Sequence, residues 1–305
     1  MSRLLIIDAH AVLHRAYHSI PPLTTNGQPV NALYGFYSML LSALDQLKPK
    51  YLIVCFDSPG PTFRSQEFIG YRAKRRPPEH DLITQLPLLP QSLDTARISS
   101  FSLGGYEADD LIATVTRQAL KCRSKIKVTI ITGDKDMMQL VGNQVELFMP
   151  LRGLSETKIF GPNEVKEKLG VLPSQVIDLK ALMGDLSDNY PGVAGIGPKT
   201  AVDLLTKYQT FNNIYSHLSN LSDLVRQKLI NDRDSAYLSR KLATLVDNIP
   251  LKLKLSSARL GPKQIAGLES IFKSYNFKSL LSRLQRKHFP KSAKLLTDSQ
   301  QKTLF

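Results

Sequence analysis

Short apolar runs that stop at an acidic residue, or one turn before it, recur along the first half of the chain. The three clearest runs and the acids that follow them are residues 4–7 with Asp8, residues 51–56 with Asp57, and residues 128–131 with Asp134. Runs that are apolar on both sides are typical of strands in a sheet that is covered on both faces. The pattern therefore predicts at least three buried strands, each ending at a carboxylate.

Segments with helical periodicity lie between these runs. Apolar residues recur every three or four positions in residues 33–47 and again in residues 107–121. Alternation of strand and helix predicts an α/β fold with a mostly parallel central sheet covered by helices. Beyond residue 160 the pattern is mainly helical, with a helix start at residues 161–165.

A basic and aromatic segment interrupts the alternation at about residues 64–94. Its cations are Arg64, Arg72, Lys74, Arg75 and Arg76, and Phe63, Phe68 and Tyr71 lie among them. Cations suit backbone phosphates and aromatic rings suit stacked bases, so we interpret this segment as an insertion above the strand ends that contacts nucleic acid. A solvated basic surface is the alternative.

We expect an α/β core at residues 1–160 that contains this insertion, a helical region at 161–285 and a flexible tail at 286–305.

The overall charge supports a polyanionic partner. The 305 residues include 40 Lys and Arg against 26 Asp and Glu, which gives a formal charge of +14. Charge alone is also compatible with an ordinary soluble basic protein.

The two cysteines, Cys55 and Cys122, lack the neighbours of a zinc site and indicate a reducing compartment. No apolar run is long enough for a signal peptide or a membrane span, so we expect a cytoplasmic protein without a membrane partner.

Nine carboxylates form compact groups against this basic background. Carboxyl ends of parallel strands lie at one edge of a sheet, and a helix N-terminus also favours carboxylates, so these acids are expected to converge. Any one of them alone could instead be a helix cap or a turn residue. Together they predict a site for divalent metal. The nine are Asp8, Asp57, Glu107, Asp109, Asp110, Asp134, Asp136, Asp185 and Asp188.

A glycine-rich turn at residues 192–201 follows the last acids. Its form is that of a helix-hairpin-helix turn, in which glycines let the backbone approach a phosphate and the next helix presents free amides. The candidate DNA contacts here are Gly195, Gly197, Lys199 and Thr200. A glycine-rich turn is a weak signal by itself, and the adjacent Asp185 and Asp188 strengthen it.

The combination of four segments resembles the 5′-nuclease family, which comprises the 5′→3′ exonuclease domain of bacterial DNA polymerase I and the flap endonucleases. The segments are residues 105–110, 132–136, 181–189 and 191–201, and the resemblance extends over about residues 3–285. It implies a helical arch at about 64–94 and a C-terminal helix-hairpin-helix region.

The resemblance also implies roles for the acids and the arch cations. Asp8, Asp57, Glu107 and Asp109, supported by Asp110, would serve a first Mg²⁺, and Asp134, Asp136, Asp185 and Asp188 a second, many of them through bound water. Arg72, Arg15 and Arg75 are the implied catalytic cations, with Arg72 at the scissile phosphate. An ordinary surface contact with phosphate is the alternative for each of them. Tyr71, Lys74 and Arg64 are implied DNA contacts. The chain departs from the family pattern in having arginine at position 72, where lysine is common, and Ala9-His10 after Asp8.

The implied activity is a magnesium-dependent, structure-specific 5′→3′ exonuclease and 5′-flap endonuclease on DNA, and on RNA–DNA primer strands, in replication and repair. Implied cofactors are two Mg²⁺ ions, with Mn²⁺ as a substitute, and K⁺ at the hairpin. Implied partners are branched or nicked DNA and a separate DNA polymerase, with a location at the nucleoid.

Two other functions are weighed against this one. A non-catalytic protein that binds branched DNA gains nothing from nine acids that repel phosphate. A phosphatase-type enzyme with Asp8 as nucleophile would want a second Asp two residues later, where His10 stands.

The last five residues resemble the clamp-binding peptide of bacterial replication proteins. Gln301, Leu304 and Phe305 fit its pattern, and an apolar pair on a flexible tail suits a groove on a sliding clamp. A chance match to so short a motif is the alternative. Deletion of residues 301–305 should abolish capture by the clamp in a pull-down and leave flap cleavage unchanged; persistent capture would refute the assignment.

Overall fold

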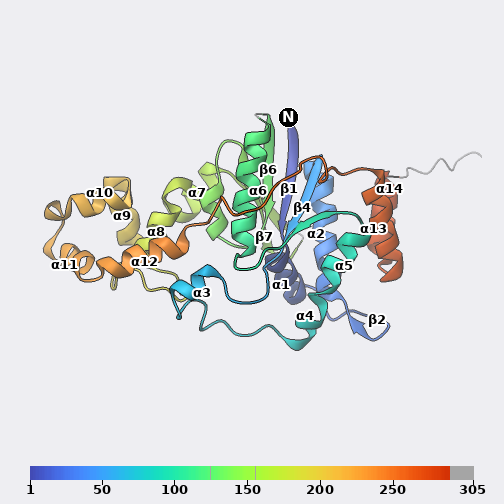
Figure 1. The fold of residues 1–305 in the computed structure, drawn as a ribbon, viewed down its shortest axis with the longest axis horizontal. Coiled ribbons are helices and arrows are strands. Elements are labelled where there is room, and N and C mark those ends of the chain that lie inside the picture. Colours follow the sequence, from blue (N-terminus) through green and yellow to red (C-terminus); the bar gives the residue numbers. More distant parts are fainter. Residues whose placement is uncertain (124, 155, 289–305) are drawn as a thin grey trace, which may run out of the picture.

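The computed structural model describes residues 1–123, 125–154 and 156–288. Its centre is a six-stranded sheet in the order β5-β4-β1-β6-β7-β8, as Figure 1 shows in part. All neighbouring strands are parallel except β7 and β8. This arrangement confirms the predicted mostly parallel α/β fold. The strands are β1 (Ser2–Asp8), β4 (Tyr51–Cys55), β5 (Ser99–Phe101), β6 (Ile126–Ile131), β7 (Val145–Arg152) and β8 (Glu156–Phe160), and β2 (Thr24–Thr25) pairs with β3 (Gln28–Pro29) in a separate hairpin.

Alternate residues of β1 belong to two different hydrophobic cores. Leu5 and Ile7 pack with helices α1 (Ala9–Ser19), α2 (Asn31–Leu47) and α5 (Leu88–Thr95). Leu4 and Ile6 face the other way and pack in one core with α6 (Ala108–Cys122) and with helices between residues 162 and 243. The sheet is therefore covered on both faces, as its uninterrupted apolar strands predict.

The C-terminal half adds a helical region beside the sheet, seen at the left of Figure 1. The predicted helix start near residue 161 is confirmed by α7, which has Pro162 in its first turn. Gly197 then caps α9 after the glycine-rich turn. The elements are α7 (Pro162–Leu169), η2 (Pro173–Gln175), α8 (Val176–Met183), α9 (Pro198–Tyr208), α10 (Phe211–Ser216), η3 (Leu218–Asn220), α11 (Asp223–Asn231) and α12 (Arg233–Ala243).

The structure differs from the expected division at residues 161–285. Helices α13 (Pro262–Ser274) and α14 (Lys278–His288) return to the N-terminal core, where Phe272 and Leu284 are buried with residues of β1 and α2. Arg283 pairs with Asp45 of α2 at 3.0 Å. Residues 262–288 therefore belong to the α/β core rather than to the helix-hairpin-helix region.

The arch segment is helical at its two ends. It begins with α3 (Phe63–Glu67) and ends with α4 (His80–Gln85) and α5, and residues 68–79 between them form turns and extended chain. Figure 1 shows this stretch passing beyond the carboxyl edge of the sheet.

Within the described residues, we find no helix with the length and apolar character that a membrane crossing needs.

Candidate active site

The carboxyl end of β1 places Asp8 at the centre of the site. Asp8 is the last residue of the strand and caps α1, so its Oδ1 accepts a hydrogen bond from the Ala11 amide at 3.0 Å. Its Oδ2 accepts from the Thr132 hydroxyl at 2.9 Å, and the same hydroxyl oxygen accepts from the Asp134 amide at 3.0 Å. The two neighbouring strands β1 and β6 thus bring Asp8 and Asp134 together.

Helix α6 is fixed against the end of β4 by Asp57. The Ala108 amide donates to Asp57 Oδ1 at 2.8 Å, which is the expected partner for a free amide at a helix N-terminus. His10 lies 3.4 Å from the other oxygen of Asp57. The hydrogen bond between Asp57 and the Ala108 amide directs the first residues of α6, including the buried Asp109, toward the same edge of the sheet.

A cavity of about 1240 Å³ opens at this edge, and six of the nine predicted acids line it. The predicted cations Arg15, Arg72 and Arg75 also line it, together with Lys180 and the exposed Leu186. The six acids are Asp8, Asp57, Asp109, Asp134, Asp136 and Asp185. The structure therefore brings together residues that are separated by up to 177 positions in the sequence.

The first four of these acids repel one another. Burial, and then the charge of Asp57, raise the pKa of Asp8 to about 7. Burial, and then Asp134, raise the pKa of Asp109 well above its usual range. Asp134 thus acts on the first group of acids, although the resemblance assigns it to the second. Such a concentration of negative charge calls for a cation.

Lys180 of α8, which the sequence analysis missed, lies between the next two acids. Its ammonium donates to Asp136 and, at 2.5 Å, to Asp185 Oδ2. Burial opposes ionisation of Asp185, but the ammonium, together with hydrogen bonds from Ser187 and from the Asp188 amide, outweighs it and lowers the pKa to about 2. Burial, and then Asp134, raise the pKa of Asp136 to about 7 despite the same ammonium. The second group, Asp136 and Asp185, therefore already contains one positive charge, the ammonium of Lys180.

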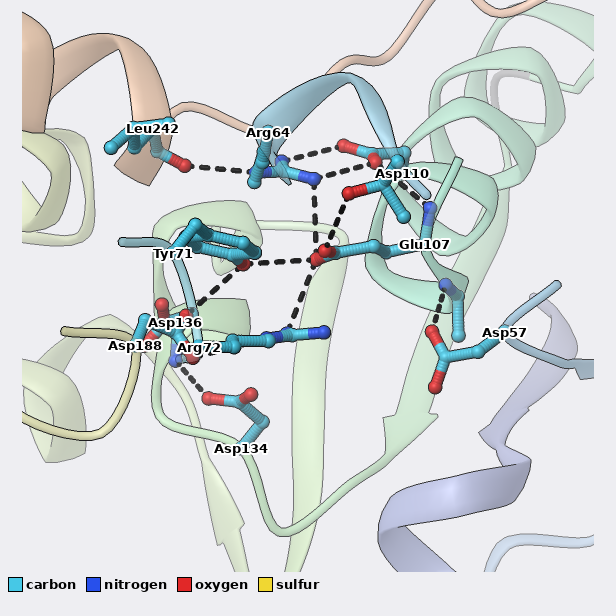
Figure 2. A network of polar contacts seen from close by, with 12 residues as sticks. Asp57, Arg64, Tyr71, Arg72, Glu107, Asp110, Asp134, Asp136, Asp188 and Leu242 are labelled. Carbon is cyan, nitrogen blue, oxygen red and sulfur yellow. Dashed lines mark hydrogen bonds and ion pairs between the residues drawn. The ribbon is translucent and has the colours of Figure 1, made fainter. Parts of the chain in front are cut away.

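The remaining three acids, Glu107, Asp110 and Asp188, do not line the cavity and belong to the network of polar contacts in Figure 2. Asp110 is fully buried and accepts two bonds of 2.8 Å from Arg64. Arg64 also donates to the Leu242 carbonyl at 2.9 Å and is 2% exposed. Arg64 is therefore not placed to contact DNA, and that prediction is wrong. Asp110 does not face the cavity, so of the predicted metal roles only the supporting one suits its position. Both form an ion pair that anchors the arch.

Tyr71 is also misassigned as a base-stacking residue. Its side chain is buried, and its hydroxyl donates to Glu107 at 3.1 Å and to Asp188 at 3.2 Å. The ring packs beside Tyr190 and Leu242. Tyr71 therefore joins the arch to two acids, and its face is covered by protein.

Arg72 and Arg75 bind the acids from the arch side. Arg72 lies 3.1 Å from both Glu107 and Asp188, and Arg75 lies 2.8 Å from Asp188. Arg72 has a φ of 55°, a left-handed conformation that is uncommon for a residue other than glycine. Its amide donates to the Asp188 carbonyl at 2.8 Å. Arg15 donates instead to the backbone carbonyls of Leu151 and Gly153.

The hairpin leading into α9 is exposed at the predicted DNA contacts. Gly195, with a φ of 73°, Gly197 and Lys199 are exposed and Thr200 is half-buried; Lys74 of the arch is exposed too. Lys228, which the sequence analysis also missed, donates to the Gly195 carbonyl at 3.0 Å. Lys228 thus adds a positive charge to the turn that is predicted to contact phosphate.

The donor set fits a hard divalent cation held through water. All six lining acids offer oxygen, which Mg²⁺ prefers, and Mg²⁺ keeps several waters. In the part of the chain that the structure describes, no three or more His, Cys, Asp or Glu side chains are arranged to hold an ion directly. The oxygen donors of the six lining acids suit a hydrated ion in the cavity. The predicted clamp-binding residues Gln301, Leu304 and Phe305 lie outside the described residues.

Comparison with known proteins identifies the family. The model for the 5′-3′ exonuclease N-terminal resolvase-like domain matches residues 3–170, and that for the 5′-3′ exonuclease C-terminal SAM fold matches residues 171–266. The chain therefore belongs to the 5′-3′ exonuclease family, whose members are nucleases, and the predicted resemblance is confirmed.

Its relatives include DNA polymerases I. That of Lactococcus lactis subsp. cremoris (strain MG1363) is 36% identical over 289 residues, which cover 93% of this chain and 33% of the polymerase. That of Caldicellulosiruptor bescii is 39% identical over 285 residues, 92% of this chain and 33% of the polymerase. The chain thus spans about a third of the length of these relatives.

Solved structures share the fold. The T5 5′-exonuclease with bound zinc has a TM-score of 0.66 at 21% identity, over 92% of this chain and 99% of the exonuclease. The catalytic core of Rad2 in complex with a DNA substrate has a TM-score of 0.57 at 16% identity, over 93% of this chain and 92% of that core.

Proposed function

We propose that the chain is a magnesium-dependent, structure-specific 5′→3′ exonuclease and 5′-flap endonuclease. The observation that carries the proposal is the group of mutually repelling carboxylates Asp8, Asp57, Asp109 and Asp134 in a cavity bordered by arch cations. Carboxylates of this kind need a divalent cation before a phosphodiester can come near them. Related chains provide support, because a flap endonuclease of bacteriophage T5 with this fold has been solved with DNA and metal ions.

The side chains divide the work between metal and substrate. Asp8, Asp57, Asp109 and Asp134 would hold one hydrated Mg²⁺, and Asp136 and Asp185 a second, with Mn²⁺ as a substitute. When bound, such ions activate a water and stabilise charge on the phosphate. Arg72 and Arg75 lie at the cavity and would exchange their acidic partners for phosphate oxygens. Glu107 and Asp188 hold these arginines in place until then.

The hairpin would grip the duplex without reading its sequence. Gly195, Gly197, Lys199 and Thr200 present backbone and charge at an exposed turn, with Lys228 beside them. A K⁺ ion at this turn remains a proposal, and duplex affinity measured in K⁺ and in Na⁺ tests it; equal affinities would reject it. RNA–DNA primer strands are a proposed substrate and a DNA polymerase a proposed partner, because the relatives that resemble this chain are DNA polymerases I.

Cleavage of an end-labelled 5′-flap duplex tests the function. We expect cuts near the flap base in Mg²⁺ and none in EDTA. Asp134→Ala should abolish cleavage and keep flap affinity in Ca²⁺ within about tenfold, whereas Asp223→Ala, an exposed acid on α11, should cleave normally. Flap binding without cleavage by the native chain would favour a binding protein instead.

The role of Arg72 has a separate signature. Arg72→Ala should lower the single-turnover cleavage rate by roughly 100-fold and weaken flap binding by less than tenfold, because the lost charge matters most as the phosphate gains charge. Weaker binding with an unchanged rate would make Arg72 a simple phosphate contact.

A further inference from the structure

Lys180 of α8 lies between the two acids that the proposed function assigns to a second divalent cation. Its ammonium donates to Asp136 and, at 2.5 Å, to Asp185 Oδ2. All three residues line the cavity, and the side chain of Lys180 is only 13% exposed. The two carboxylates therefore already hold one cation, and the ammonium marks the place where a cation fits them.

The loop that follows α8 fixes Asp185 in this position. Its Oδ1 accepts from the Ser187 amide at 2.7 Å and from the Asp188 amide at 3.1 Å. Its backbone pairs with that of Tyr190 through two hydrogen bonds of 2.9 and 3.1 Å. One carboxylate oxygen is thus engaged within the loop, and the other, Oδ2, meets the ammonium of Lys180.

Asp136 approaches the ammonium from a different part of the chain. It begins η1 (Asp136–Leu140), and its amide donates to Asp134 Oδ1 at 2.8 Å. Two carboxylates and one ammonium leave one net negative charge at the pair. A divalent ion that entered beside the ammonium would meet a like charge at close range, and such repulsion is strong at a partly buried position. The ion and the ammonium therefore compete for the same oxygens.

We propose that the ammonium of Lys180 competes with the second divalent cation, which binds Asp136 and Asp185 only in exchange for it. The inference rests on the proposed function, since it needs a second ion. A lysine suits an exchangeable role, because its ammonium is a point charge on a flexible stem and can swing away while both acids stay in place. Lys180 thus holds the two acids together before the ion arrives and weakens the binding of the ion that displaces it.

The chain offers a matched control in Lys135. This lysine also lines the cavity, but it is exposed, and the described ion pairs of Asp136 and Asp185 are with Lys180. Lys180→Met removes the charge between the acids and keeps an apolar stem. Lys135→Met removes an equal charge from the same cavity, and Lys180→Arg keeps a charge between the acids. A difference among the three variants therefore reports the ammonium between the acids rather than the total charge.

The experiment is a titration of the full chain with Mn²⁺, followed by electron paramagnetic resonance. Lys180→Met should bind the second ion at least roughly tenfold more tightly than the native chain, because the competing charge is gone. Lys180→Arg and Lys135→Met should both stay within about threefold of the native chain, since the first keeps the competing charge and the second loses a charge that solvent screens. Lys180→Gln is a second neutral variant if the methionine variant does not fold.

Thermal unfolding separates competition from a purely structural ion pair. In EDTA, Lys180→Met should unfold at a lower temperature than the native chain, because two neighbouring carboxylates lose their cation. Saturating Mn²⁺ should remove most of that difference, since an ion that binds the folded variant more tightly also stabilises it more. A purely structural ion pair would leave the same difference in EDTA and in Mn²⁺, and that result would contradict the competition.

The binding outcomes separate this inference from the proposed function. Unchanged or weaker binding of the second ion by Lys180→Met would overturn the competition, and so would an equal gain in Lys135→Met, because any charge in the cavity would then act alike. A second ion that Lys180→Met binds and the native chain does not would support it, as complete exclusion by the ammonium. One ion bound by both would remove the second metal and the competition with it, while flap cleavage by the native chain in Mg²⁺ would still decide whether the chain is a nuclease.

Discussion

At the scale of the residue, Asp8 shows how much folding stability the acidic site costs the protein when no metal ion is bound. Its pKa in the folded chain is about 7, against 3.8 for an ordinary aspartate. The folded state thus holds the proton more tightly than the unfolded state does. The stability that this bound proton contributes is fully present below about pH 4. It is lost as the pH rises through 7, and the free energy of unfolding falls by about 4 kcal/mol at most.

Asp8→Asn removes this titration and should abolish its contribution to the pH dependence of stability. In EDTA at pH 8, we expect the variant to have a free energy of unfolding roughly 1–4 kcal/mol higher than the native chain, and near pH 4 the two should agree. Urea unfolding at both pH values measures the difference. Asp223→Asn, which alters an exposed acid, is the control. A native chain as stable at pH 8 as the asparagine variant would show that Asp8 is ionised without cost.

At the scale of the element, the base of the arch depends on one buried ion pair. Arg64 joins α3 to Asp110 in α6 and to the Leu242 carbonyl at the end of α12. Its removal would leave a buried carboxylate without its cation, which typically costs 3–5 kcal/mol. Arg64 therefore orders three elements around the site without contacting substrate.

Arg64→Met should lower the free energy of unfolding by about 3–5 kcal/mol, and Arg76→Met, an exposed arginine of the arch, by less than about 0.5 kcal/mol. In combination with Asp110→Asn, the loss should be smaller than the sum of the single losses, because the uncompensated charge is gone. Urea unfolding of the four variants provides the test. If Arg64→Met weakened flap binding and left stability intact, the earlier assignment of Arg64 to DNA would be restored.

The arch and the acids beside it show which parts of the site the sequence could predict and which it could not. Strand ends and helix periods predicted the positions of Asp8, Asp57 and Asp134, because a parallel sheet gathers its carboxyl ends. Arg64 and Arg75 are alike in a basic segment, and only tertiary packing buries one and exposes the other. Lys180 was missed because it lies in a mostly apolar helix, although a lone cation five residues before Asp185 was a signal that could have been followed.

At the scale of the whole molecule, the site depends on helices from the end of the described chain. Phe272 of α13 is fully buried, and its ring centroid lies 5.3 Å from that of Tyr37 in α2. Helix α2 covers the sheet face formed by Leu5 and Ile7, and the latter directly precedes Asp8. No periodicity within residues 262–288 could predict this contact, since it joins segments more than 200 residues apart.

The two returning helices should therefore stabilise the nuclease core itself. Phe272→Ala removes a ring from a packed cluster and should lower the free energy of unfolding by about 3–5 kcal/mol, whereas Lys273→Ala, whose side chain is 60% exposed, should change it by less than about 0.5 kcal/mol. Urea unfolding measures both, and flap cleavage should be lost at the lower urea concentration that unfolds the Phe272 variant. Because α2 and β1 share one core with α13, unfolding and loss of cleavage should coincide; cleavage that outlasts the unfolding transition would mean that these helices form a separate unit, as the sequence first suggested.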